Sequence, residues 1–385
     1  MTGARHLYVH LPFCSSRCGY CDFVTVVGRH GEHGRYVGAL LRELELRRQL
    51  LAPRVETVYL GGGTPTVTDP AALERLLGAL PAAAEATVEA NPETVTPGLA
   101  ALLRRCGVDR VSLGAQTFAP RLLAVLDRVA RPDDVRRAVY RLRDAGFDNI
   151  SLDLIYGIPG QSTADLGRDL AQALALEPEH VSAYELEAKP GTRFTHAHGA
   201  ELERQAGSME TYFERVVVTL TAAGYRWYET ANFCRSAQGL VADGSTADGS
   251  AAGGVAGRDL RCRHNLGYWL GHDYLGLGVG AVSTIENRRW RNAPSLGRYV
   301  AALESGRLPP HEVEALPPYV RETERIMLGL RLDEPLPLAG LERALDAGQL
   351  ERLEGLGLAV REREGLALTV RGRFLGGGVT ARLLA

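Results

Sequence analysis

Short apolar runs alternate with amphipathic stretches over the first two hundred residues of this 385-residue chain. Six runs are rich in β-branched and aromatic residues, have the length of buried strands, and begin near residues 7, 56, 86, 110, 149 and 180. The stretches between them repeat apolar side chains three and four positions apart, which predicts helices over residues 36–51, 71–80, 98–106, 133–146 and 163–176. Six strand–helix units in series predict an α/β fold. Its parallel sheet, joined by right-handed crossovers, curls into a partial (β/α)6 barrel.

The barrel pattern occupies residues 1–235, and the rest of the chain divides by composition. Residues 236–261 are rich in Gly, Ala, Ser and Asp and have almost no bulky side chains. Such a segment buries too little apolar area to become ordered, so we predict a disordered insertion. Residues 262–310 form a small α+β connector. Residues 311–385 combine helical patterns with two short strand-like runs around "EREG", an order that resembles a winged-helix-like module.

Charge and hydropathy narrow the possible partners and compartment. The formal net charge is −2, and the C-terminal segment has no basic face, so we expect no nucleic-acid partner. No apolar run approaches the ~20 residues of a transmembrane helix, and the N-terminus lacks the apolar core of a signal peptide. We therefore expect a cytoplasmic protein with reduced thiols, and a peripheral membrane contact stays open.

Three of the six cysteines, Cys14, Cys18 and Cys21, lie together in "PFCSSRCGYCDF". Disulfides between them would close very short loops and leave one thiol unpaired. Zinc usually takes four nitrogen or sulfur ligands, and no second C-x-x-C or H-x-x-x-H pair lies nearby. Iron–sulfur clusters are held by closely spaced thiolates. Three thiolates can hold three corners of a cubane cluster and leave the fourth iron open for a reactive ligand.

Other candidate residues follow the later strands, where barrels of this kind place their chemistry. The turn "LGGGTPT" lets backbone approach a ligand closely, although a tight turn also needs glycines. Glu89, Gln116, Arg128 and Asp153 lie at strand ends or on the helix after one. Taken singly, Glu89 and Asp153 are better explained as loop caps and Arg128 as a solvated helix residue.

The C-x3-C-x2-C spacing after a strand, with Tyr20 before the last cysteine, resembles the radical S-adenosylmethionine (SAM) superfamily. The resemblance implies a [4Fe–4S] cluster on the three cysteines, whose open iron chelates SAM. It also implies that the GGxxP-like turn holds the SAM amino group. In order and spacing, the polar residues resemble the SAM contacts of the coproporphyrinogen oxidase branch. The implied SAM set is Tyr8, Tyr20, Gly62, Gly63, Thr64, Glu89, Gln116, Arg128 and Asp153.

Two features narrow the branch. Where the oxidases have a fourth cysteine, this chain has Phe23. The sequence "HNLGYW" also resembles the HNxxYW signature of the HemW-type heme chaperones. An imidazole can ligate iron and large aromatic side chains can cover a porphyrin face, so the motif suits heme. The heme residues implied are His264, Asn265, Tyr268 and Trp269.

The residues alone favour a plainer interpretation of this motif, an aromatic packing turn in which His264 bonds a backbone carbonyl. Cys262, His272 and Tyr274 are rival iron ligands that the sequence does not exclude. The family resemblance spans nearly the whole chain, and the Gly/Ala-rich segment interrupts it.

The resemblance implies a heme chaperone that carries a [4Fe–4S] cluster and SAM and delivers heme to acceptor hemoproteins. A reductant for the cluster would be a further partner. Two alternatives are weighed against it: oxygen-independent coproporphyrinogen III oxidase, which decarboxylates propionates by radical chemistry, and a radical SAM C-methyltransferase. Whether the protein is an enzyme stays open. Phe23 and "HNLGYW" disfavour oxidase activity, and no residue is assigned a catalytic role.

Overall fold

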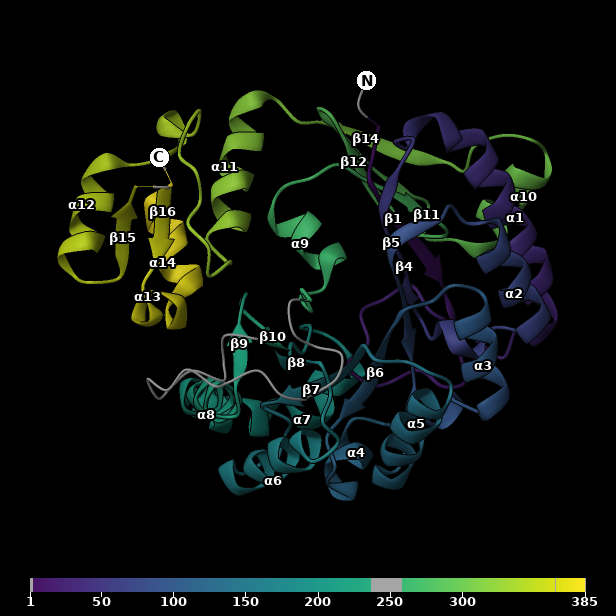
Figure 1. The fold of residues 1–385 in the computed structure, drawn as a ribbon, viewed down its shortest axis with the longest axis horizontal. Helices are drawn as coiled ribbons and strands as arrows, with labels where there is room; N and C mark the ends of the chain where they lie inside the picture. The colour runs from purple at the N-terminus through teal and green to yellow at the C-terminus, as the bar shows by residue number, and fades with distance from the viewer. Residues whose placement is uncertain (1–2, 237–257, 364, 385) are drawn as a thin grey trace, which may run out of the picture.

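The computed structural model describes residues 3–236, 258–363 and 365–384 (Figure 1). The predicted insertion at 236–261 lies outside the described residues, except for Ser236 and residues 258–261 at its two ends.

The centre of the molecule is a sheet in which six parallel strands follow one another in chain order. All six correspond to the predicted apolar runs: β1 (His6–Leu11), β4 (Val55–Gly62), β5 (Ala83–Ala90), β6 (Arg110–Gln116), β7 (Ile150–Tyr156) and β8 (His180–Glu185). Figure 1 shows these strands arranged along an arc, so the predicted partial barrel is confirmed. Because the strands are parallel, their carboxyl ends meet at one edge.

Helices lie along the outer side of the arc (Figure 1). They are α1 (His33–Arg47), α2 (Pro70–Ala79), α3 (Pro97–Arg105), α4 (Pro120–Val125), α5 (Pro132–Asp144) and α6 (Thr163–Leu174). Five of them match the predicted helices, and the short α4 is additional. Asp69 and Ser162 cap α2 and α6, because each side chain accepts a hydrogen bond from a first-turn N–H. Within the described ranges, no helix is both long and apolar enough to cross a bilayer.

Later segments extend both edges of the parallel sheet. After α7 (Arg193–Gln205) and α8 (Met209–Ala222), strands β9 (Tyr225–Trp227) and β10 (Asn232–Arg235) continue it antiparallel beyond β8. At the other edge β11 (Tyr274–Leu277) pairs parallel with β1. Antiparallel strands β12 (Val282–Ile285), β13 (Arg288–Asn292) and β14 (His311–Ala315) follow, with α10 (Leu296–Glu304) between β13 and β14.

Before β11 pairs with β1, the chain forms α9 (Arg263–Trp269), the short helix that carries "HNLGYW". This helix lies inside the arc and packs against β4 (Figure 1). The hydroxyl of Thr57, on β4, lies 2.7 Å from His264 Nδ1. Near the start of the chain, the paired strands β2 (Phe13–Cys14) and β3 (Val26–Val27) bracket the cysteine loop.

Residues 318–383, called the C-terminal module, have their own buried core. The order is α11 (Pro318–Gly329), α12 (Ala347–Gly355), the hairpin β15 (Ala359–Glu362) and β16 (Gly365–Leu368), then α13 (Val370–Phe374) and α14 (Gly376–Leu383). Helices followed by a hairpin are the order expected of a winged-helix-like module. A two-bond ion pair from Arg226 to Asp333, at 2.7 and 2.9 Å, joins the module to the barrel.

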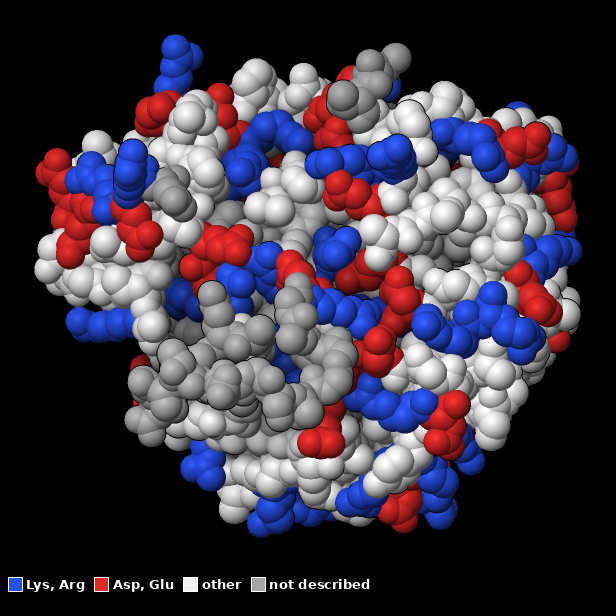
Figure 2. Space-filling view, viewed as in Figure 1, with Lys and Arg blue, Asp and Glu red and all other residues white. Residues whose placement is uncertain are grey.

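Charges of both signs are interspersed on the face of the molecule shown in Figure 2. Lys and Arg alternate with Asp and Glu over the barrel and over the C-terminal module. Extended basic stripes are the electrostatic footprint of nucleic-acid binding. The described residues of this face form no such stripe.

Candidate functional site

A cavity of about 520 Å³, called the first cavity, opens at the carboxyl edge of the sheet beside the cysteine loop. All but one of the predicted cluster and SAM residues line it: Cys14, Cys18, Tyr20, Cys21, Gly62, Gly63, Thr64, Glu89, Gln116, Arg128 and Asp153. The exception is Tyr8. Segments more than a hundred residues apart in sequence therefore converge on one space.

The three motif cysteines are free thiols, all partly exposed. Cys14 Sγ lies 3.6 Å from the Thr64 hydroxyl, and Arg128 donates from Nη1 to Cys18 Sγ at 3.7 Å. Burial raises the pKa of the Cys14 and Cys21 thiols, and neighbouring cysteine sulfurs add to the effect. Without a metal these thiols therefore stay protonated, and metal binding would release their protons. Three thiols on one cavity wall are a donor set that can hold an iron–sulfur cluster.

The glycine turn is required by the packing of the protein itself. Gly62 has φ +113°, and a Cβ there would lie 2.5 Å from the ring of His10. A Cβ on Gly63 would lie 2.6 Å from the backbone of Pro12. Both glycines let the end of β4 approach the start of the cysteine loop, so the turn and the loop form one wall of the cavity.

Two half-buried carboxyl groups line the cavity. Glu89 accepts hydrogen bonds from the Tyr59 hydroxyl at 2.8 Å and from the Gly62 N–H at 3.1 Å. Burial, with a contribution from the charge of Asp153, raises the pKa of Glu89 to about 7. Asp153 accepts from the Ser112 hydroxyl at 2.9 Å, and burial raises its pKa as well. Both groups can accept ligand hydroxyls, because carboxylate oxygens have several lone pairs.

Gln116 reaches the cavity through a distortion of β6. The register of β6 against β7 shifts between Leu113 and Gln116, and Gln116 has φ +62°. Left-handed backbone in a residue other than glycine is strained and concentrates at functional sites.

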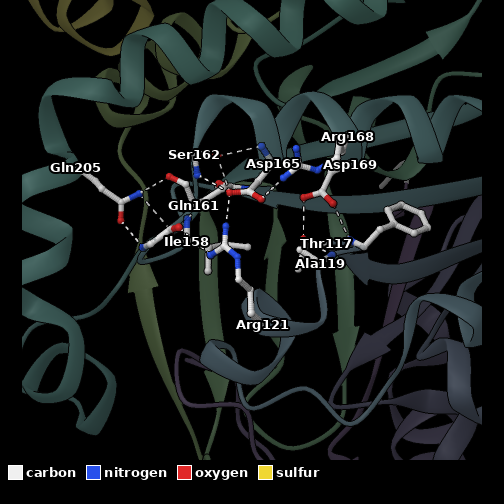
Figure 3. A network of polar contacts seen from close by, with 12 residues as sticks. Thr117, Ala119, Arg121, Ile158, Gln161, Ser162, Asp165, Arg168, Asp169 and Gln205 are labelled. Atoms are coloured by element: carbon white, nitrogen blue, oxygen red, sulfur yellow. Dashed lines mark hydrogen bonds and ion pairs between the residues drawn. The ribbon is translucent and has the colours of Figure 1, made fainter.

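The loop that follows Gln116 is held by hydrogen bonds to Asp169 of α6 (Figure 3). Asp169 accepts from the Thr117 hydroxyl and from the Phe118 N–H, both at 2.7 Å. Beside it, Asp165 joins Ser162 to Arg121 in the same network. These bonds keep the strained residue in place.

Asn91 joins two walls of the first cavity, and sequence reasoning missed it. Its Nδ2 donates to the Thr64 hydroxyl at 3.1 Å, and its Oδ1 accepts from Arg128 Nη2 at 2.7 Å. The same Arg128 nitrogen donates to the Gly114 carbonyl at 3.0 Å. The available signal was the position of Asn91 two residues after Glu89, directly before a proline at a strand end.

Tyr8 lies behind the cavity wall. His10 Nε2 contacts the Val24 carbonyl at 2.8 Å, so this nitrogen donates and Nδ1 is left to accept from the Tyr8 hydroxyl at 3.1 Å. The ring of Tyr8 stacks on Tyr59. Tyr8 therefore contacts the cavity indirectly, through Tyr59 and the segment that follows the cysteines.

The residues of "HNLGYW" separate into a pair that lies away from the cavities and a pair that lines them. His264 is 1% exposed, and its ring nitrogens contact the Thr57 hydroxyl at 2.7 Å and the Tyr268 hydroxyl at 3.0 Å. Burial lowers the pKa of His264 to about 3, so the ring is neutral. His264 and Tyr268 do not line the first cavity, whereas Asn265 does.

A second cavity, of about 760 Å³, lies between the barrel and the C-terminal module. Asn265 and Trp269 line it, and Asn265 is shared with the first cavity. The rival ligands Cys262, His272 and Tyr274 line neither cavity. Cys262 is fully buried, and His272 Nδ1 lies 3.1 Å from His6 Nε2.

Residues 8–173 match the family model described as the radical SAM superfamily. The chain is 39% identical to a Mycobacterium tuberculosis protein named heme chaperone HemW, over 98% of this chain and 94% of that protein. It is 30% identical to the Bacillus subtilis protein of the same name, over 99% of each. Among solved structures, coproporphyrinogen III oxidase from Escherichia coli superposes with a TM-score of 0.78 at 22% identity, covering 99% of this chain and 90% of that one. At that identity the superposition shows the fold alone.

Proposed function

The chain belongs to the HemW family of heme chaperones, within the radical SAM superfamily, and from this premise we propose that it binds heme together with a [4Fe–4S] cluster and SAM. We extend the proposal to delivery of the heme to acceptor hemoproteins. The observation that carries it is the convergence of three free thiols, a glycine turn and two half-buried carboxyl groups on the first cavity.

The residues present fit a three-cysteine cluster. Cys14, Cys18 and Cys21 are the cysteines that line the first cavity, and no disulfide occupies their sulfurs. The Arg128 guanidinium lies beside this group of sulfurs, with Nη1 at 3.7 Å from Cys18 Sγ. When bound, the cluster and SAM would supply electron transfer and any radical chemistry, while the protein orients and shields them.

The remaining residues of the first cavity would orient SAM. Glu89 and Asp153 can accept hydrogen bonds from ribose hydroxyls, and Arg128 can pair with a carboxylate. Asn91 would keep Arg128 in position through its 2.7 Å hydrogen bond. We extend the proposed set from the residues implied by sequence to Asn91 for this reason.

Heme binding is the part of the proposal that separates a chaperone from the oxidase alternative. Phe23, which stands where the oxidases have a fourth cysteine, is 64% exposed at the rim of the first cavity. Heme titration of anaerobically reconstituted protein, with and without SAM, tests the proposal directly. We expect stoichiometric heme binding and no release of CO2 from coproporphyrinogen III. Turnover of coproporphyrinogen with SAM and a reductant would instead establish the oxidase.

His264 has two candidate roles that one variant distinguishes. As an iron ligand it would have to give up a hydrogen bond at one ring nitrogen, and His264→Ala would then move the Soret band of bound heme. As a positioning residue for α9 it would support Asn265 and Trp269. We expect the second result: a loss of about 2 kcal/mol of stability, from two buried hydrogen bonds, with the Soret band unmoved.

A further inference from the structure

The second cavity has a composition distinct from that of the first. It lies between the end of the barrel sheet and the C-terminal module, and it shares Tyr184, Glu185, Glu187 and Asn265 with the first cavity. A volume of about 760 Å³ lies within the usual range of ligand sites. The cavity therefore adjoins the proposed SAM site through a common wall.

Aromatic rings line the barrel side of this cavity and continue onto the module. Phe213 packs edge-on against Trp227 at 5.6 Å, and Phe374 lies 5.3 Å from Phe213 and 5.5 Å from Trp227. Tyr156 stacks on Phe213 at 6.3 Å. Trp269 of α9 lies on another part of the lining. Trp227 and Tyr156 are 6% and 5% exposed, so the partly exposed rings of Phe213, Phe374 and Trp269 provide most of the surface that suits a large flat apolar ligand.

Two arginines of the C-terminal side each lie over a tryptophan of the barrel side. The Arg373 guanidinium lies 3.7 Å from the Trp227 ring centroid, and that of Arg331 lies 4.8 Å from Trp269. Burial lowers the pKa of Arg373 to about 10, so it remains charged at neutral pH. In the described part of the chain, neither guanidinium has a hydrogen-bond or ion-pair partner, and Arg373 Nη2 and Trp269 Nε1 are buried donors without acceptors.

Unsatisfied buried donors are costly, so a cavity that contains two of them favours a ligand with acceptor oxygens. The acidic residues of the cavity do not supply a hydrogen-bond acceptor to these donors. Glu229 is buried and bonded to Asn232, and its charge acts on both Arg331 and Arg373 without a direct bond to either. Glu185 and Glu187 belong to the wall shared with the first cavity. Two guanidinium groups against one buried carboxyl group leave the module end positive, and the ligand expected there is a carboxylate.

We propose that the second cavity is the heme site, with the aromatic lining against the porphyrin and Arg331 and Arg373 for the propionates. This inference rests on the proposed function. It also means that the iron ligand is a residue of this lining and not His264. Of the side-chain types that ligate heme iron, the described residues of the lining include Met327, Tyr156 and Tyr184 but no His or Cys.

The test compares heme with heme dimethyl ester, in which the propionates are capped, on full-length protein with its cluster reconstituted. Wild type should bind heme about tenfold or more tightly than the ester, because the ester cannot form a charge-assisted hydrogen bond between a propionate carboxylate and an arginine. Arg331→Gln and Arg373→Gln should each weaken heme binding and reduce this discrimination. Arg371→Gln is the matched control, since Arg371 lies on α13 together with Arg373, is exposed, and does not line the cavity.

The outcomes separate the inference from the proposed function. If wild type binds no heme, the proposed function fails. If wild type binds heme but both cavity variants keep the affinity and the discrimination, heme binds elsewhere and only this inference fails. Because Arg373 is half-buried, the cluster absorption and the unfolding midpoint of each variant are measured alongside. The exposed Arg331 provides the test should Arg373→Gln not fold.

Discussion

The two cavities share a wall, yet the chain builds them in different ways. The first cavity takes its polar residues from the ends of consecutive strands. Each of these residues therefore lies in a short sequence motif, and the motifs follow one another along the chain in the order of the strands. The second cavity draws on residues from Tyr156 to Leu384, which belong to the barrel, to α9 and to the C-terminal module. A repeating β/α architecture therefore leaves its site visible in sequence. A cleft between two modules leaves only scattered aromatic residues and arginines.

The largest effect should come from replacing the cysteines proposed to hold the cluster. This change sharpens the comparison because it acts on the first cavity alone. We expect Cys14→Ala, Cys18→Ala and Cys21→Ala each to abolish the broad cluster absorption and the bound iron and sulfide. Replacement of the cysteines outside the motif, Cys106, Cys234 or Cys262, should leave both near wild type. A full cluster in Cys18→Ala would refute the three-cysteine assignment.

A second effect, of up to about 3 kcal/mol, concerns Glu89 in the SAM-free protein. Its pKa is raised from 4.5 to about 7, so between these values the native state holds a proton that the unfolded chain has released. The free energy of unfolding should therefore fall as the pH rises through this interval. In denaturant titrations Glu89→Gln should flatten this fall, whereas Glu89→Asp should retain part of it. Identical slopes in wild type and Glu89→Gln would contradict the burial argument.

A third effect tests whether Asn91 belongs to the first cavity functionally. Asn91→Ala removes the link between Thr64 and Arg128, and we expect SAM affinity to fall about tenfold with the cluster unchanged. Equilibrium binding of SAM to reconstituted protein measures this. Gln49→Ala, an exposed change near the end of α1, is the control. Unchanged SAM affinity in Asn91→Ala would remove the residue from the proposed set.

The smallest effect tests the boundary of the second cavity. Asp333→Asn weakens the two-bond pair with Arg226 that joins the C-terminal module to the barrel, a pair worth about 1 kcal/mol given its partial exposure. We expect heme affinity to fall two- to fivefold while SAM affinity stays constant. A change in SAM affinity of equal size would show that the two cavities are coupled through their common wall.

Much of the fold and of the first cavity could be predicted from the sequence. Apolar periodicity located the six strands and five of the helices, because burial on one or both faces dictates which positions are apolar. Parallel strands bring their carboxyl ends to one edge, so Glu89 and Asp153 could be expected near the cysteines before any contact was known. The spacing of the three cysteines in turn indicated the kind of cluster they could hold.

Only the tertiary structure decided what happens between elements that are distant in sequence. Tyr8 and Tyr59 face each other because β1 and β4 pair in one particular register, which puts Tyr8 behind the cavity wall. His264 became an internal residue because β11 returns to β1 and brings α9 against Thr57. Arg373 meets Trp227 because the C-terminal module docks on the barrel edge. Periodicity reports which side of an element is buried, whereas the partner on that side is chosen by long-range packing, which local sequence does not encode.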